Sequence, residues 1–234
     1  MNLFNRILGV FVNPKDTFKA LAEKPLWVDA LILLLILVVV YFLLIGPYLQ
    51  QDQIKAFENN TRLKERIGED AFNQRLEFIK NPPPFMVIFG IALQPVSVLI
   101  GFLLSSLIIL GLARLTSTEG KYVQVLSAFI HANAINLILG NALRVFLILN
   151  RKSVLQTTTS LAIFFPKLEV TSPAFVVLAQ IDFFQLWVFG VLGYALSSVF
   201  QIELKKGLIL SYSFWFIKSL FYIALGLLNL RYGA

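Results

Sequence analysis

The stretch QIDFFQLWVFGVLGYALSSVFQIELKK, residues 180–206, decides the class of this fold. It is apolar over residues 183–200, with Asp182 before the run and two lysines after it. About 20 apolar residues cross the hydrocarbon core of a bilayer, so we predict a transmembrane helix over residues 182–200. Small residues recur on one face of this helix at three- and four-residue spacing, and these are Gly190, Gly193 and Ser197. Such a stripe lets another helix backbone approach closely, which predicts a helix that packs against others.

The composition of the whole chain agrees with a lipid environment. Hydrophobic residues make up 58% of the 234 residues, and the mean hydropathy is +0.78. A soluble domain averages roughly 45–50% apolar residues. The chain has no cysteine and one histidine, His131, which excludes disulfide frameworks, thiol nucleophiles and multi-histidine metal sites, and we expect no cofactor. In so apolar a chain, the net charge of +7 favours anionic lipid headgroups over nucleic acid as the partner.

Four further apolar runs complete a set of five predicted spans. The predicted transmembrane helices cover residues 26–49, 85–112, 122–149, 182–200 and 208–230. The fold class is therefore all-α, and the chain is a polytopic integral membrane protein with five transmembrane helices. We treat residues 1–234 as a single domain.

Two segments outside these spans are also predicted to be helical. Residues 1–25 carry apolar positions at helical spacing and an Asn13-Pro14 helix start, which predicts two short amphipathic helices in the membrane interface. Residues 50–81 are the only long polar segment, with mixed charges and regularly spaced apolar residues. This pattern predicts a helical extramembrane loop, with a break at Gly68 between two amphipathic helices.

Five spans place the two termini on opposite sides of the membrane. Basic residues are denser in the segments on the N-terminal side, which predicts a cytoplasmic N-terminus and a C-terminus on the other side of the cell membrane. Charged residues fill the first 24 positions, so we expect the first span itself, rather than a cleavable signal peptide, to direct insertion.

Polar side chains inside the predicted spans form the candidate functional site. The candidate polar cluster is Gln94, Asn133, Asn136, Arg144, Asp182 and Lys218. Polar groups at this depth are expensive and normally face the interior of a bundle.

A rise of 1.5 Å per residue places Arg144 and Asp182 toward the face opposite the N-terminus, and we predict an ion pair between them. The same estimate places Lys218 near the midplane, where we expect it to meet Gln94, Asn133 and Asn136. Three simpler interpretations stay open. Asp182 would only cap its helix, Lys218 would extend along its stem to water, and the asparagines would be ordinary packing contacts.

A second small-residue stripe lies on the predicted helix over residues 85–112. Its members are Ser97, Gly101 and Ser105, at four-residue spacing. With the stripe on the helix over residues 182–200, it leaves surface for self-association. Besides membrane lipids, a homo-oligomer or another membrane protein is therefore a candidate partner.

Three blocks of sequence carry a family resemblance that covers essentially the whole chain. They are NPKDTFKALAEKP (13–25), STEGKYVQVLSAFIHAN (117–133) and IDFFQLWVFGVLGYAL (181–196), the last followed by Lys205-Lys206-Gly207. Together they resemble the Yip family of Ypt-interacting, five-span membrane proteins. The resemblance implies a five-helix integral membrane protein with a cytoplasmic N-terminus. Eukaryotic members act in early secretory traffic with Rab-type GTPases. This chain lacks their long polar N-terminal region and has an expanded segment over residues 50–81. It is therefore more similar to the short prokaryotic members, and a small GTPase is a doubtful partner.

Two functions of different classes follow. The first is a membrane scaffold or interaction protein without enzymatic activity. The alternative is a small transporter or channel that uses the mid-membrane polar cluster. No nucleophile–base pair, metal constellation or glycine-rich phosphate loop is present in the sequence, so we do not expect an enzyme. An intramembrane site built from Asp182 and His131 is the one enzymatic arrangement left open.

Overall fold

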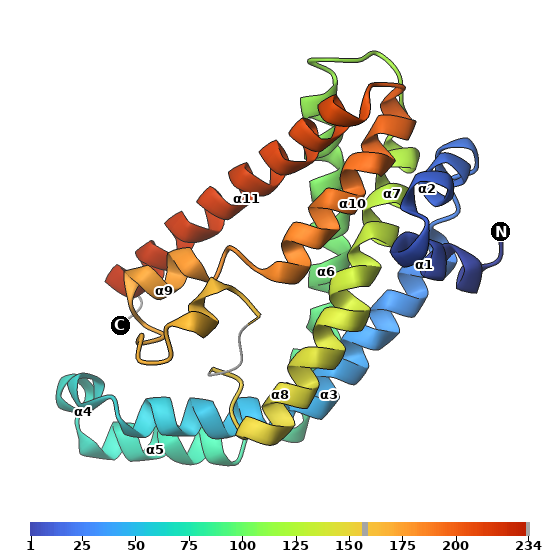
Figure 1. Cartoon of the computed structure of the whole chain (residues 1–234). Helices are drawn as coiled ribbons and strands as arrows, with labels where there is room; N and C mark the ends of the chain where they lie inside the picture. The colour runs from blue at the N-terminus through green and yellow to red at the C-terminus, as the bar shows by residue number, and fades with distance from the viewer. Residues whose placement is uncertain (156–158, 233–234) are drawn as a thin grey trace.

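The computed structural model describes residues 1–155 and 159–232, and its regular elements there are helices, apart from one isolated β-bridge (Figure 1). In chain order they are α1 (Leu3–Val12), α2 (Pro14–Glu23), α3 (Val28–Glu58), α4 (Thr61–Ile67), α5 (Glu69–Lys80), α6 (Pro84–Ala113), α7 (Tyr122–Ala134), the π-helix η1 (Ile135–Gly140), α8 (Asn141–Arg151), the 3-10 helix η2 (Leu161–Phe164), α9 (Pro173–Leu178), α10 (Phe183–Phe200) and α11 (Leu204–Tyr232).

Five helical segments are long and apolar enough to cross a membrane. They are Val28–Glu58, Pro84–Ala113, Tyr122–Arg151, Phe183–Phe200 and Leu204–Arg231. The all-α fold class with five spans is thereby confirmed. The third span is continuous, since α7, η1 and α8 follow one another without a gap. It is not one regular α-helix, because the π-helix η1 lies between α7 and α8.

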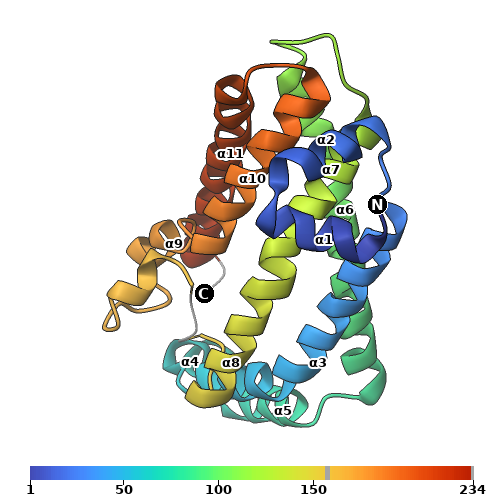
Figure 2. The same ribbon diagram turned by 45° about the vertical axis from the view of Figure 1, so that its right-hand side comes forward.

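Helix α10 lies at the centre of the bundle. Of its apolar window 56% is buried inside the protein, whereas the other four spans bury between 22% and 33% of theirs. It packs against α2, α7, η1 and α11, and the views in Figures 1 and 2 show it between α7 and α11. The stretch that decided the fold class is therefore also the most buried of the five spans.

Helices α10 and α11 form a close antiparallel hairpin. A Cβ atom built on Gly207 would lie 2.5 Å from the carbonyl oxygen of Gly193 and 3.0 Å from the backbone nitrogen of Ser197. The Ser197 hydroxyl donates to the carbonyl of Ile202 at 2.6 Å, inside the connection between the two helices. The small-residue stripe of α10 thus allows the close backbone approach for which such stripes are used in membranes.

The second predicted stripe, on α6, is not packed in the same way. A Cβ atom at Gly101 would meet nothing within 4 Å, and the Ser97 hydroxyl donates to the carbonyl of Leu93, one turn back on its own helix, at 3.0 Å. This face of α6 therefore points away from the rest of the chain.

Helix α3 continues beyond the predicted end of the first span. An interior proline, Pro47, lacks the N–H that the helix ladder needs and favours a bend. The last part of α3 then lies crosswise beside α5 (Figure 1). The Gln50 amide donates to the carbonyls of Ile79 and Lys80 at 3.1 and 3.0 Å, and Lys80 forms an ion pair with Glu58 at 3.0 Å. The predicted polar loop therefore begins, from residue 50 to Glu58, as a continuation of α3. We call this part the surface arm of α3.

The rest of that polar segment is helical, with the predicted break. Gly68 separates α4 from α5 with a φ of +83°, a conformation that glycine adopts without strain. At the other end of the segment, Pro84 is the first residue of α6.

The N-terminal helices α1 and α2 pack across the outside of α7 and α10 (Figure 2). The Asn13 side chain caps α2 by accepting from the backbone N–H of Asp16 at 3.4 Å, and Pro14 takes the first helical position. The Gln124 amide on α7 donates to the carbonyl of Ala22 at 2.6 Å and fixes the end of α2 to the bundle.

Candidate functional site

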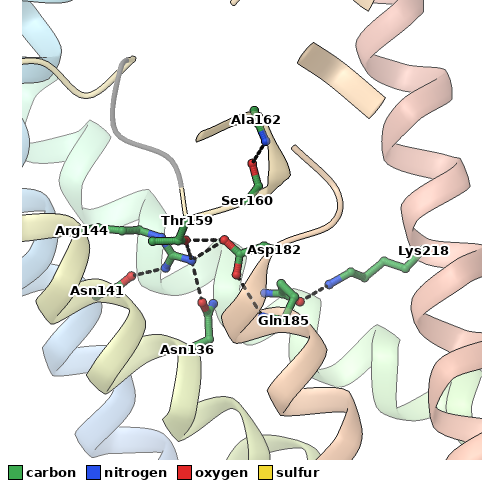
Figure 3. A network of polar contacts seen from close by, with 9 residues as sticks. All are labelled: Asn136, Asn141, Arg144, Thr159, Ser160, Ala162, Asp182, Gln185 and Lys218. Atoms are coloured by element: carbon green, nitrogen blue, oxygen red, sulfur yellow. Dashed lines mark hydrogen bonds and ion pairs between the residues drawn. The ribbon is translucent and has the colours of Figure 1, made fainter. Parts of the chain in front are cut away.

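The predicted ion pair between Arg144 and Asp182 is formed. An Nη2 to Oδ2 distance of 3.2 Å joins the first turn of α8 to the N-cap residue of α10 (Figure 3). Only 18% of the Arg144 side chain and 12% of the Asp182 side chain are exposed. Because both charges are largely removed from solvent, each compensates for the burial of the other.

The two oxygens of Asp182 have different partners. Oδ1 accepts from the backbone N–H of Gln185 at 3.0 Å and caps α10, whereas Oδ2 accepts from Arg144 and from the hydroxyl of Thr159. The two interpretations left open by the sequence, a helix cap and an ion pair, are both realised by one carboxylate.

The guanidinium of Arg144 is surrounded by further polar and aromatic groups. Nη2 donates to Asn136 Oδ1 at 3.0 Å and lies 3.1 Å from Thr159 Oγ1, and Nη1 donates to Asn141 Oδ1 at 3.1 Å. The guanidinium carbon lies 5.8 Å from the centre of the Phe184 ring. A positive charge over an aromatic face is attracted by the ring quadrupole, so the site satisfies the cation from several directions.

The connection between α8 and α10 is held to this site by its backbone. The N–H of Leu161 donates to the carbonyl of Ile181 at 3.0 Å, and the N–H of Phe183 donates to the carbonyl of Thr159 at 3.1 Å. These bonds flank the isolated β-bridge between Ser160 and Asp182. The bridge presents the Thr159 hydroxyl to the ion pair (Figure 3).

Lys218 joins the site from α11, but not through the predicted partners. Its Nζ donates to Gln185 Oε1 at 3.0 Å and lies 5.2 Å from the centre of the Phe189 ring. The backbone N–H of Gln185 also donates to Asp182. Gln185 therefore links the lysine to the ion pair, as Figure 3 shows.

The expected meeting of Lys218 with Gln94, Asn133 and Asn136 was wrong. The Gln94 amide donates to the carbonyl of Gly90 at 3.3 Å, and the Asn133 amide donates to the carbonyl of Phe129 at 2.8 Å, each one turn back on its own helix. Asn136 reaches Arg144 instead. Amides inside a membrane that find a carbonyl on their own helix need no partner on another one.

The π-helical turn explains why the asparagine stripe is split. In a regular α-helix, residues 133, 136, 140 and 144 share one face. The wider turn of η1 lies inside this stretch and rotates the residues after it relative to those before it. Gly140 leaves room beside the ion pair, because a Cβ atom there would lie 2.9 Å from Asn136 Oδ1 and 3.1 Å from Arg144 Nη1.

Sequence reasoning missed two members of the site, Thr159 and Gln185. A signal for Gln185 was present, because it follows Asp182 by three residues and therefore lies on the same helical face. Thr159 lies in an irregular connection, where no periodicity indicates which side chain faces the bundle.

A separate buried polar group lies on the N-terminal side. Arg6 of α1 is only 3% exposed and forms an ion pair with Asp29 of α3. His131 is fully buried, and its Nδ1 donates to the carbonyl of Ser127 at 2.8 Å. The structure therefore does not bring His131 to Asp182, which binds Arg144 near the opposite end of the same span.

The described residues offer the site charge pairing and hydrogen bonding rather than metal coordination. Within residues 1–155 and 159–232, no group of three or more histidine, cysteine, aspartate or glutamate residues is placed to hold a metal ion. The arrangement ties α8, α10, α11 and the connection before α10 into one unit through polar groups that satisfy one another.

Comparison with known protein families identifies the family of the chain. The family model described as the Yip1 domain matches residues 8–226, which is nearly the whole chain. No curated protein and no solved structure matches the chain.

Proposed function

The chain belongs to the Yip family of multi-pass membrane proteins, and from this membership we propose that it is a membrane scaffold or interaction protein without enzymatic activity. Its partners are membrane lipids and other membrane proteins, a second copy of the chain among them. We place it with the short prokaryotic members of the family, in the cell membrane, with a cytoplasmic N-terminus and the C-terminus on the opposite side. A small GTPase is not part of the proposal.

The observation that carries this proposal is the inverted polarity of α1. Its one charged residue, Arg6, points into the bundle and is 3% exposed. The outward face presents Phe4, Leu8 and Val12, of which Phe4 is 72% and Val12 is 71% exposed. An apolar ridge at four-residue spacing on a helix at the surface is suited to lie in the headgroup region or against the apolar face of another membrane protein.

The polar network supports the same function. Arg144, Asp182 and Lys218 each have a polar partner on another part of the bundle. Groups that satisfy one another in this way hold helices in register, and a scaffold needs such a fixed shape to present its surfaces.

Site-specific photocrosslinking in the native membrane tests the proposal. A photoreactive residue in place of Phe4 should give adducts with lipid or with membrane proteins, whereas the same residue in place of the fully buried Val10 should give crosslinks within the chain only. Phe4 adducts restricted to water-soluble proteins, or none at all, would contradict the proposed role of the ridge.

A small transporter or channel is the alternative, and the environment of Lys218 favours it. The ammonium group lies inside a span and contacts an amide and an aromatic ring. Within the described part of the chain it forms no ion pair with a carboxylate. Ionisable groups at this depth mark ion or solute paths in many membrane proteins.

Flux measurements on proteoliposomes separate the two functions. If the protein is a scaffold, vesicles that contain the natural protein or Lys218→Ala should release small cations and anions no faster than protein-free vesicles. Solute movement that Lys218→Ala abolishes would establish the transporter instead.

A further inference from the structure

A groove runs between α3 and the η1–α8 part of the third span. Its volume is about 400 Å³. It is lined by Leu37, Val40, Tyr41, Leu44, Leu137, Ile138, Asn141, Ala142 and Val145. A volume of this size lies in the range of roughly 300–1,000 Å³ that is usual for sites of small organic ligands.

The walls of the groove are apolar and open to the surroundings of the bundle. Val40 is 43% and Leu44 is 49% exposed, and Ala142 on the opposite wall is also exposed. The π-helical turn supplies Leu137 and Ile138, so the irregular part of the third span forms one end of the groove. Turns of this kind occur often at functional sites.

A cation lies at the end of α8 beside Tyr48, which shares a helical face of α3 with Tyr41 and Leu44 of the groove. Lys152 ends α8 in a left-handed conformation, with its Nζ 5.5 Å from the centre of the Tyr48 ring and 3.5 Å from its hydroxyl. The side chain is exposed, and within the residues that the structure describes it has no carboxylate partner. An anionic group bound here would meet an available positive charge.

The spacing between groove and cation matches one leaflet of a bilayer. Leu37, at the inner end, and Tyr48, beside Lys152, are separated by 11 positions of α3. At a rise of 1.5 Å per residue this corresponds to about 16 Å. Half of a hydrocarbon core that is ≈ 30 Å thick is about 15 Å.

We propose that this groove binds an anionic glycerophospholipid of the leaflet opposite the N-terminus. One acyl chain lies between α3 and α8, and the phosphate meets the ammonium group of Lys152. The apolar walls select a chain of hydrocarbon, and the exposed cation at one leaflet's distance selects a negative headgroup. Since Asn141 lines the groove and also accepts from Arg144, a bound lipid would contact the polar network of the candidate site.

Native mass spectrometry of the full-length protein, released from detergent with added lipid, tests the proposal. The probes are phosphatidylglycerol and phosphatidylcholine with identical acyl chains. The natural protein should retain phosphatidylglycerol about fivefold more strongly, the preference expected of one lysine at the membrane surface. Lys152→Gln should abolish this preference, and Ala142→Phe, which fills the groove, should lower retention of both lipids.

Two matched variants serve as controls. Lys167→Gln removes an exposed lysine outside the groove, and Ala92→Phe enlarges an exposed alanine on α6. Both should behave like the natural protein. Leu44→Phe, which fills the groove from the α3 wall, replaces Ala142→Phe if that variant does not fold.

The proposal requires that the groove and the cation act together. Equal retention of the two lipids by the natural protein would overturn it. It would also be overturned if Lys167→Gln had the same effect as Lys152→Gln, or if the groove-filling variants bound phosphatidylglycerol normally.

Discussion

At the scale of single residues, Asp182 shows how one side chain connects local structure with packing. One oxygen completes the first turn of α10, and the other neutralises a cation on α8. A helix end leaves backbone N–H groups without partners, and a buried guanidinium needs a counter-charge. The two functions can be separated experimentally, because asparagine caps a helix as well as aspartate does but carries no charge.

We expect Asp182→Asn to destabilise the protein by about 3 kcal/mol, because it leaves the Arg144 charge buried without a counter-charge. Unfolding in detergent micelles measures the change. The double variant Arg144→Met, Asp182→Asn removes both charges and should recover most of the lost stability. If Asp182→Asn unfolds like the natural protein, Asp182 stabilises the protein through its helix cap and not through its charge.

A second carboxylate, Asp52, performs a comparable function on the surface arm of α3. Its Oδ2 accepts from the backbone N–H groups of Val154 and Leu155 at 2.6 and 3.2 Å, and from the hydroxyl of Ser153 at 3.0 Å. Asp52 is only 5% exposed, so these bonds compensate for its burial.

Asp52→Ala should therefore cost about 2 kcal/mol and loosen the chain after α8. Hydrogen exchange should show faster exchange at the amides of Val154 and Leu155, with little change in α10. Glu65→Ala, at an exposed position of α4, is the matched control and should leave both amides unchanged. Unchanged exchange at these two amides in Asp52→Ala would show that the chain after α8 does not depend on the Asp52 carboxylate for its stability.

At the scale of elements, the α10–α11 hairpin depends on two glycines that face each other. The backbones approach so closely that a side chain on Gly207 would overlap with the carbonyl oxygen of Gly193. In lipid there is little hydrophobic drive between helices, so contacts of this kind supply much of the attraction.

Gly207→Ala should separate the two helices and destabilise the protein by about 1–3 kcal/mol, the usual effect of overpacking. Gly111→Ala is the control, because a Cβ atom there meets nothing within 4 Å. It should be neutral or stabilising by up to about 1 kcal/mol, as expected for alanine in place of glycine in a helix. Equal thermal stability of the two variants would contradict the close contact.

The elements also show how far sequence could lead. The five spans were predictable because length and apolarity alone decide whether a helix can cross a bilayer. The ion pair was predictable because depth follows from residue number. The partner of Lys218 was not predictable, because the choice between Gln185 and Asn136 depends on how each helix is rotated about its own axis. Nor was the extension of α3 past Pro47, since hydropathy marks the end of a span and not the end of a helix.

At the scale of the whole molecule, the five spans separate two surfaces. Helices α1 and α2 lie toward one, and α4, α5 and the last part of α3 lie at the other (Figures 1 and 2). The chain contains no cysteine, so single cysteines can report on each surface without a background.

Glu65→Cys on α4 should react with a membrane-impermeant maleimide added to intact cells, and Lys15→Cys on α2 should react only after the membrane is permeabilised. This follows from the denser basic residues on the N-terminal side. The reverse labelling pattern would invert the proposed orientation. Labelling of both positions in intact cells would mean that the surfaces are not on opposite sides.

The π-helical turn at Ile135–Gly140 has a consequence for how the gene can change. The π-helical turn holds about one residue more than an α-helical turn, so loss of one residue from the turn itself, with a return to regular winding, would leave Arg144 facing Asp182. Loss of one residue between the turn and Arg144 would instead rotate Arg144 by about 100° away from Asp182. Among homologues, insertions and deletions should therefore be rare between this turn and Arg144, and frequent in the polar segment between the first and second spans.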